Sequence, residues 1–464
     1  MDRDEAREAI VAAFEELGLL DHVEDHDHSV MTCYRCHTKL EPWESEQWFV
    51  AVDALKEPAA RVVEDGSIQF HPARWKQVYL DWLANLKDWC ISRQLWWGHR
   101  IPMFYCDTCG WEDASVEEIE VCPVCGAPVR QDEDVLDTWF SSQLWPFATM
   151  GWTEEGMDAP QMRDAYPTQV LSTARDIMGL WVARMVMASM YCCDETIPFD
   201  DAIIHPTVMA ADGKPMSKSR GNGVDPLRLM EDYGADGMRM AMLISSSAGN
   251  DVMFDEALCE QGRNFGNKIW NAYRLLNGWA VDAAAAQSEN NRLAVAWFGQ
   301  ALDRSLRQIA EDFKSYRISE AFKEAYRLFW DDFSGLYLEM AKPAYGQPID
   351  APTMEATKGY FDALMRVLHP FMPFVTEEIW QDLAPRAEGA SICVAQMPEP
   401  AAEDAAMLAR FELAKEIITS VRSIRNQKNL PQKEALTLRV IADENYPAEF
   451  APVMMKMANL AAIE

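Results

Sequence analysis

The sequence has few basic residues for its size. Its 464 residues include 42 lysines and arginines against 74 aspartates and glutamates, which gives a net charge of −32. Contacts to phosphate dominate the affinity of proteins for nucleic acids, so this balance alone argues against a nucleic-acid-binding surface over the whole chain. A local basic face on an acidic body remains compatible with it.

The sequence also lacks a long apolar run and a signal peptide. No apolar stretch is long enough to span a bilayer, and the charged opening, Met1–Glu8, does not have the layout of a secretory signal. We therefore predict a cytoplasmic protein with no membrane partner. The composition is 49% apolar and 11% aromatic, as in globular proteins, and the length suffices for two or three domains.

The cysteines are arranged as metal ligands. Three Cys-x-x-Cys pairs occur among 11 cysteines, a metal-binding pattern rather than a disulfide framework in a reducing compartment. Twelve residues separate two of the pairs, and a glycine after each relieves a tight turn. These pairs are Cys106/Cys109 and Cys122/Cys125. Four thiolates close a tetrahedron around a structural zinc ion and leave no open position for water. Free thiols or a redox pair are the alternatives, and a zinc ribbon suits a nucleic-acid-binding module as well as an enzyme.

A loop at residues 212–222 is rich in groups that bind phosphate. It holds two glycines, three cationic side chains and two hydroxyls in eleven residues. Gly213 and Gly221 allow unusual backbone angles, and the serine hydroxyls and the charge of Lys218 can bind oxyanions. The composition suits a polyphosphate whose charge grows as a bond breaks. A polar surface turn is the alternative interpretation.

This loop resembles the Lys-Met-Ser-Lys-Ser signature of class I aminoacyl-tRNA synthetases. Residues 89–102, which include an aromatic Leu-Trp-Trp-Gly-His-Arg stretch, look like the valyl-tRNA synthetases. The first lysine of the signature is replaced by Pro215, with Lys214 displaced by one position. The usual His-Gly pair on the adenine side is His205-Pro206, and no His-x-Gly-His element is present.

The resemblance implies roles for particular residues. Adenylation is assigned to Lys218, Ser217, Ser219 and Lys214, and ATP binding to His205, Met216 and Lys218. The amino-acid pocket is assigned to Trp139, Asp176 and Ile177, which leave an apolar slot for a small branched side chain. Contacts to tRNA are assigned to Arg263, Lys268 and Arg274.

The resemblance also implies a reaction and its partners. A valine–tRNA ligase activates L-valine with ATP and Mg²⁺ and transfers it to tRNA(Val), and we expect a monomer with one structural zinc ion. An isoleucine-specific relative and a non-enzymatic tRNA-binding module are the alternatives. Because most of an editing domain is absent, the chain is interpreted as the C-terminal portion of a synthetase that does not form adenylate alone. Cys33 and Cys36 are then an orphaned half of a metal site, or free thiols in a plain turn.

The expected fold class is α/β plus all-α, with a partial Rossmann-type class I catalytic domain, a zinc-ribbon insertion and a helical-bundle anticodon-binding domain. The expected boundaries are 1–50 for an editing-insertion remnant, 51–250 for the catalytic part with the ribbon at about 101–131, 251–420 for the helical domain, and 421–464 for a truncated C-terminal region.

Apolar spacing predicts local structure. We expect a helix from the N-terminus to Gly18, followed over residues 60–102 by a strand, a helix and a strand-like junction. In the helix at residues 75–86, Val78, Trp82 and Leu86 share one apolar stripe with Tyr79 and Leu83 beside it, as in core packing. A strand is expected to run into a loop at residues 134–142, Thr376–Glu378 are expected to cap a helix, and the last residues are expected to be helical.

Overall fold

The computed structural model describes residues 1–33, 36–41, 44–210, 212–216, 221–246, 250–431, 433–441 and 443–464, with the side chain of Glu154 left out. The chain forms two compact units. The first consists of Met1–Val50 and Trp89–Leu136, and the second of Ala51–Asp88 and Asp137–Glu464. In the described part of the chain, every helix is too short or too polar to cross a membrane.

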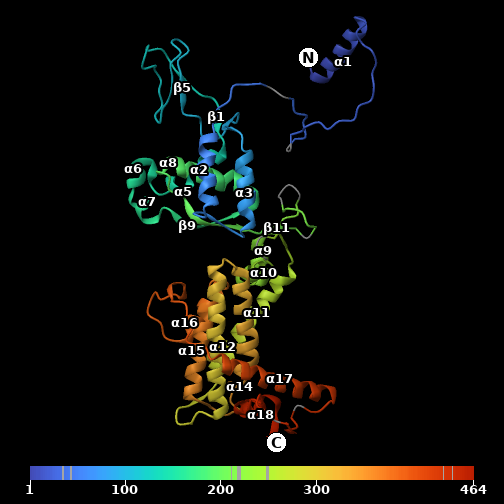
Figure 1. Ribbon diagram of the computed structural model, residues 1–464, viewed down its shortest axis with the longest axis vertical. Coiled ribbons are helices and arrows are strands. Elements are labelled where there is room, and N and C mark those ends of the chain that lie inside the picture. The colour runs from blue at the N-terminus through green and yellow to red at the C-terminus, as the bar shows by residue number, and fades with distance from the viewer. Residues whose placement is uncertain are drawn as a thin grey trace. The chain divides into compact units, whose positions relative to one another are not determined.

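The first unit contains one helix and several short antiparallel strands (Figure 1). Its elements are α1 Arg3–Glu16, β1 Phe49–Val50, β3 Trp89–Cys90, β4 Ser92–Arg93, β5 Met103–Tyr105, β6 Glu112–Ala114, β7 Arg130–Gln131 and β8 Val135–Leu136. Strand β1 pairs with β3, β4 with β8, and β5 lies between β6 and β7. The predicted N-terminal helix is confirmed, with Gly18 just beyond its end, but α1 buries none of its side chains.

The second unit begins with a three-stranded parallel sheet in the order β2-β10-β9. The elements of this part are α2 Asp53–Glu64, β2 Gln69–His71, α3 Arg74–Asn85, α4 Thr138–Ser142, α5 Trp145–Ala148, α6 Trp152–Glu155, η1 Gly156–Asp158, α7 Pro160–Ala165, β9 Thr168–Ala174, η2 Arg175–Ile177, η3 Met178–Ala183, α8 Arg184–Cys192 and β10 Phe199–His205. One apolar core joins the sheet to α2, α3 and α8, and Phe70, Leu171 and Ile204 represent the three strands in it.

The predicted order of strand, helix and strand-like junction over residues 60–102 is confirmed as β2, α3 and the short strands β3 and β4, although residues 60–64 still belong to helix α2. Helix α3 forms where expected and buries Tyr79 and Leu83, with Trp82 and Leu86 partly buried against the same core. The prediction fails at Val78, which is 45% exposed. Helix α2 and the segment Met178–Ala183 both pack against α3 and select the residues that it buries.

The helix after β9 starts with an irregular turn. Residues 175–177 form a 3₁₀ turn, Met178–Ala183 form a π-helix, and a regular α-helix follows from Arg184. A β-carbon on Gly179 would lie 2.4 Å from the ring of Trp82. Glycine therefore lets the π-helix approach α3 closely, and such π segments are frequent near functional sites.

The rest of the second unit is almost entirely helical. Its elements are β11 Val208–Met209, α9 Pro226–Tyr233, α10 Ala235–Ser245, β12 Val252–Met253, α11 Ala257–Asn277, β13 Val281–Asp282, α12 Glu289–Lys314, α13 Ile318–Arg327, η5 Leu328–Tyr337, α14 Leu338–Ala341, β14 Ile349–Asp350, α15 Ala351–Leu368, α16 Pro373–Leu383, η6 Ile392–Val394, α17 Ala405–Gln427, β15 Leu436–Leu438, η7 Ala448–Phe450, α18 Ala451–Ala458 and β16 Leu460–Ile463. Helices α11, α12, α15 and α16 form a bundle (Figure 1). The predicted fold class is confirmed.

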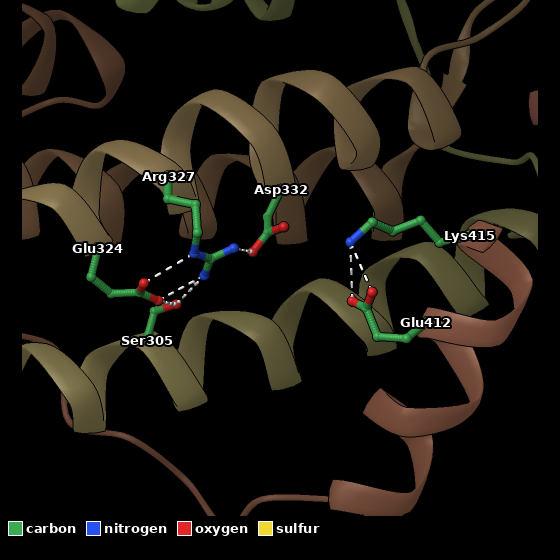
Figure 2. A network of polar contacts seen from close by, with 6 residues as sticks. All are labelled: Ser305, Glu324, Arg327, Asp332, Glu412 and Lys415. Atoms are coloured by element: carbon green, nitrogen blue, oxygen red, sulfur yellow. Dashed lines mark hydrogen bonds and ion pairs between the residues drawn. The ribbon is translucent and has the colours of Figure 1, made fainter. Parts of the chain in front are cut away.

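The bundle has one large core rich in aromatic residues. The inner face of α11, with Phe265, Ile269 and Leu276, is fully buried. A charged network lies within this bundle, where Arg327 binds Glu324, Ser305 and Asp332 (Figure 2). Burial raises the pKa of the Asp332 carboxyl, although Arg327 opposes that effect.

Two predictions for the end of the chain are wrong, because residues distant in sequence supply a helix cap and a strand-pairing partner. Helix α16 begins at Pro373, and Asp236 accepts hydrogen bonds from the backbone N–H groups of Phe374 and Val375 at its start. Thr376 therefore lies inside the helix and does not cap it. The last residues form strand β16, which pairs in parallel with β15 instead of continuing a helix.

Candidate active site and metal centre

The carboxyl ends of the three parallel strands bring candidate residues to one edge of the sheet. Strand β10 ends at His205, which is opposite Ala174 at the end of β9, and β2 ends at His71. In open parallel sheets, ligands bind at this edge. The side chain of His205 is exposed there, and its Nδ1 lies 3.0 Å from the carbonyl oxygen of Pro206.

Asp176 and Ile177 follow β9 directly at this edge. Asp176 lies in the 3₁₀ turn with 70% of its side chain exposed, and it caps no helix. Arg175 holds the turn, because its guanidinium lies 3.4 Å from Asp176 and donates to Asp251 at 3.0 Å. Arg175 was not among the site residues predicted from the sequence. Its position directly after a strand is the feature of the sequence that could have marked it as a site residue.

Trp139 belongs to a short helix near the same segment. The predicted strand is only Val135–Leu136, and residues 138–142 form α4 instead of a loop. The carboxylate of Asp137 accepts from the backbone N–H of Trp139, and Trp139 itself is half-buried. The indole of Trp181 donates to the carbonyl oxygen of Ser142 at 3.1 Å, which fastens α4 to the π-helix.

The described residues at the start of the signature loop follow strand β11, which is held by pairing with a second short strand. Strand β11 pairs in parallel with β12, and a turn closes where Gly213 donates to the carbonyl oxygen of Ala210. The ammonium group of Lys214 is exposed and lies 4.0 Å from Asp212. Pro215 faces Met209 across the stem, next to Met216. Ser217, Lys218 and Ser219 lie outside the described residues.

A cavity of about 500 Å³ opens at the same edge and includes His71, Ser172, His205 and Tyr316 in its lining. His71 donates from Nε2 to Asp201 at 2.6 Å, and the hydroxyl of Tyr316 donates to the other oxygen of that carboxylate at 2.8 Å. This hydrogen bond from Tyr316 to Asp201 raises the pKa of the tyrosine. His71 was missed from the sequence, although a strand-end histidine followed by proline signals such a position.

The four cysteines of the predicted ribbon come together. The Sγ atoms of Cys106 and Cys125 are 3.5 Å apart, and those of Cys109 and Cys122 are 3.6 Å apart. All four sulfurs lie within 4.8 Å of one another. Sulfurs bound tetrahedrally at about 2.3 Å from zinc are about 3.8 Å apart, so this donor set fits the ion.

Backbone turns at the two pairs explain the geometry. Gly110 and Gly126 have φ of 72° and 75°, as the sequence predicts for tight knuckles. The backbone N–H of Cys109 is the main group that lowers the pKa of the Cys106 thiol, to about 6. Cys33 and Cys36 join no such cluster among the described residues, and Sγ of Cys36 lies 3.2 Å from the hydroxyl of Thr38.

The three candidate tRNA-binding residues lie on α11, and one of them lines a groove. A groove of about 470 Å³ contains Lys268, several asparagines of α11 and Trp330, whose ring lies 4.4 Å from the Lys268 ammonium. Arg263 pairs with Glu260 and lies over the ring of Tyr233. Arg274 is exposed.

Comparisons with known proteins decide the family. Residues 22–255 match the family of class I tRNA synthetases (I, L, M and V). The chain belongs to the class I tRNA synthetases. Residues 296–441 match the anticodon-binding domain of tRNA ligases, so the predicted relationship is confirmed for both parts of this synthetase chain.

The similar curated proteins are valine–tRNA ligases. The protein from Parabacteroides distasonis is 48% identical over all of this synthetase chain, which covers 54% of that relative. The one from Thermotoga maritima is 42% identical over 95% of the chain and 50% of the relative. The chain thus spans about half the length of the curated relatives it matches.

Solved structures with the same fold have low sequence identity. Methionyl-tRNA synthetase of Mycobacterium tuberculosis with methionyl-adenylate has a TM-score of 0.56 at 16% identity and covers 81% of this chain and 71% of its own. The LeuRS of Agrobacterium radiobacter K84, in a complex with tRNA and LeuAMS, has a TM-score of 0.53 at 18% identity over 70% of this chain and 43% of its own.

Proposed function

We propose that this chain forms one side of the amino-acid-activating site of a valine-specific tRNA synthetase and carries part of its tRNA-binding surface. The observation that carries the proposal is the 48% identity with a valine–tRNA ligase over the whole chain. The grouping of Asp176, Ile177 and His205 at the carboxyl edge of the sheet supports it.

The chemistry assigned to the site is adenylate formation. A carboxylate oxygen of valine attacks the α-phosphorus of ATP, the bond to pyrophosphate breaks, and Mg²⁺ accompanies the nucleotide as part of the substrate. Negative charge grows on the leaving pyrophosphate, and Lys218, with the hydroxyls of Ser217 and Ser219, stabilises it. His205 and Met216 contact the nucleotide. Lys214 contributes less, because Pro215 occupies the usual lysine position and Lys214 is displaced by one residue.

Valine is selected by shape in this proposal. Helix α4, which carries Trp139, is hydrogen-bonded through Trp181 to the π-helix that directly follows Ile177. Trp139 and Ile177 are proposed as apolar walls of a slot for a small branched side chain. The rival substrate is isoleucine, which adds one methylene. One methylene is worth about 1–3 kcal/mol in an apolar pocket, so exchange with isoleucine is expected to be roughly 10-fold to 200-fold weaker.

One zinc ion bound by the four ribbon cysteines has a structural role in this proposal. The thiolates occupy all tetrahedral positions, so the metal takes no part in activation. The exposed face of α11, with Arg263, Lys268 and Arg274, is proposed as the tRNA contact on an otherwise acidic chain. Lysine and arginine neutralise phosphates there, and the groove beside Trp330 offers an aromatic face and amide groups to a base.

The experiment is amino-acid-dependent ATP–pyrophosphate exchange, with this chain joined to the part of the Parabacteroides distasonis relative that it does not match. We expect exchange with valine and a loss of about 10²–10³-fold for Lys218→Ala. Lys214→Ala is the matched control. It should lower the exchange rate less, because the charge of Lys214 is displaced from the usual lysine position. Preferential exchange with isoleucine, or equal losses for the two variants, would contradict the proposal.

The tRNA contact is tested by binding of tRNA(Val) at several salt concentrations. Lys268→Ala should weaken binding and flatten the salt dependence, because it removes a phosphate contact. The control is Lys358→Ala, which removes an exposed lysine from α15. Equal effects of the two variants would show that α11 is not a specific contact.

A further inference from the structure

A second cluster of metal-binding side chains lies in the helix bundle, apart from the ribbon and the sheet edge. His369 follows α15, Glu377 lies in α16, and Cys393 lies in the short helix η6. One ligand atom of each lies within 4.8 Å of the other two. Nε2 of His369 and Sγ of Cys393 lie 3.2 Å apart.

The hydrogen bonds of His369 fix which ring nitrogen carries the proton. The hydroxyl of Thr376 is fully buried and donates its one proton to a backbone carbonyl, with Met372 at 2.8 Å. Its oxygen therefore accepts from Nδ1–H of His369, also at 2.8 Å. In the neutral ring Nε2 then has a free lone pair, and that atom faces Cys393. Ligating histidines in metal sites are oriented in the same way by a hydrogen bond to their other nitrogen.

The carboxylate of Glu377 is also held in place, by hydrogen bonds from residues that are not themselves metal ligands. It accepts from the hydroxyl of Ser391 at 2.7 Å, from the amide of Gln381 at 2.7 Å, and from the backbone N–H of Ile392 at 3.2 Å. A carboxylate has about four lone-pair sites, so these three donors leave room for a cation. Ser391 also accepts from the backbone N–H of Cys393, which keeps the cysteine beside the carboxylate.

We propose that His369, Glu377 and Cys393 bind one zinc-class transition-metal ion, with water in the fourth position. Imidazole, thiolate and carboxylate are all zinc ligands, with bonds of about 2.0–2.3 Å. Two ligands at that distance from a tetrahedral ion are about 3.5 Å apart, close to the 3.2 Å between nitrogen and sulfur. The thiolate and the carboxylate balance a double positive charge. Mg²⁺ and Ca²⁺ do not fit, because they prefer sites made of oxygen.

The bound ion joins three segments that are distant in sequence. The end of α15, the first turns of α16 and the η6 segment share one ligand each, so the ion links the bundle to the chain that precedes α17. An ion that binds only the folded state raises its stability in proportion to the logarithm of its concentration. The rival interpretation is a thiol-to-imidazole hydrogen bond without metal.

The first test is elemental analysis of zinc-equilibrated, dialysed chain. Replacing Cys393→Ala should lower the zinc content by one ion per chain, and Cys109→Ala should lower it by a separate ion. The matched control is Cys192→Ala, which removes a half-buried thiol outside both clusters and should change nothing. Equal zinc in the Cys393→Ala variant and the unchanged chain would overturn the proposal.

Two further measurements test the site without counting zinc ions. When cobalt(II) is added to the zinc-saturated chain, it should first replace zinc at the three-ligand site. The bound cobalt should then give thiolate-to-cobalt absorption, and the Cys393→Ala variant should not show that absorption. Thr376→Val preserves shape but removes the hydrogen bond that orients His369, and it should weaken the cobalt affinity about 10–100-fold. Cys393 is exposed, so zinc, but not magnesium, should protect it from a thiol reagent. Absence of protection together with unchanged cobalt absorption would show a hydrogen bond only.

Discussion

The ribbon and the helix bundle of this chain are held together in opposite ways. Strands β5–β7 have two or three residues each, and Ile101 and Phe104 are the main buried apolar side chains near them. The bundle buries one continuous core with more than a dozen aromatic and aliphatic side chains from α11 to α18. Ligand bonds therefore replace burial in the ribbon, whereas the bundle folds on its apolar core.

The largest expected difference between the two regions follows removal of metal. Chelation should unfold residues 101–131, because structural zinc supplies about 10–16 kcal/mol in small metal-binding folds. Amide hydrogen exchange measured by mass spectrometry should rise across the ribbon and stay unchanged in α11 and α12. Equal protection of the ribbon with and without chelator would show that the four thiols are not its main support.

Acid should weaken zinc binding in the ribbon. The thiol of Cys106 has a pKa lowered to about 6, whereas burial and neighbouring sulfurs outweigh the backbone N–H of Trp111 and raise the pKa of Cys109 to about 12. Zinc must displace protons from these thiols when it binds, so the apparent affinity of the ribbon for zinc falls as the pH falls. The fall becomes steeper below about pH 6, where the thiol of Cys106 also takes up a proton.

Close backbone contact in the bundle provides the next test. A β-carbon on Gly262 would lie 2.4 Å from the carbonyl oxygen of Gly237, where α10 meets α11. Gly262→Ala should therefore lower the free energy of unfolding by about 3 kcal/mol, measured by urea denaturation. Gly266→Ala, one turn further along α11, meets only the end of Met372 at 3.8 Å and should be neutral or slightly stabilising. Similar losses for both would contradict the packing.

The charged network in Figure 2 gives the smallest effects. Arg327→Gln leaves Glu324 and the buried Asp332 without their cation and should cost about 2 kcal/mol, less than a fully buried pair because Arg327 is partly exposed. Lys415→Gln breaks the exposed pair with Glu412 and should cost less than about 0.5 kcal/mol. Urea denaturation of both variants checks the ranking, and a larger loss for Lys415→Gln would reverse it.

Features that depend on local sequence could be predicted. The four cysteines converge because two knuckles with glycine turns fix each pair, and the inner face of α11 follows from its apolar spacing. Features decided by distant segments could not. Val78 is exposed because the elements packed on α3 cover other residues of that helix, and Asp236 caps α16 from a different helix.

The candidate site shows the same division. The strand ends at Ala174 and His205 were recognisable, because apolar strands followed by polar turns mark that edge. The π-helix after Ile177, the contact of Gly179 with Trp82 and the hydrogen bonds of His71 depend on packing between elements, and no single stretch of sequence encodes them.

The most direct test of the account is valine-dependent ATP–pyrophosphate exchange by the 464-residue chain alone. The chain carries the signature loop with Lys218 but no His-x-Gly-His element. Without an opposing wall, a lysine acts on phosphate through water, where its charge has a weak effect, and the reacting groups are not held in line. We predict no exchange above the enzyme-free rate, with salt-dependent binding of tRNA by the same preparation. Robust exchange by the chain alone would contradict the account and would show that Trp139, Asp176 and the loop at residues 214–219 suffice.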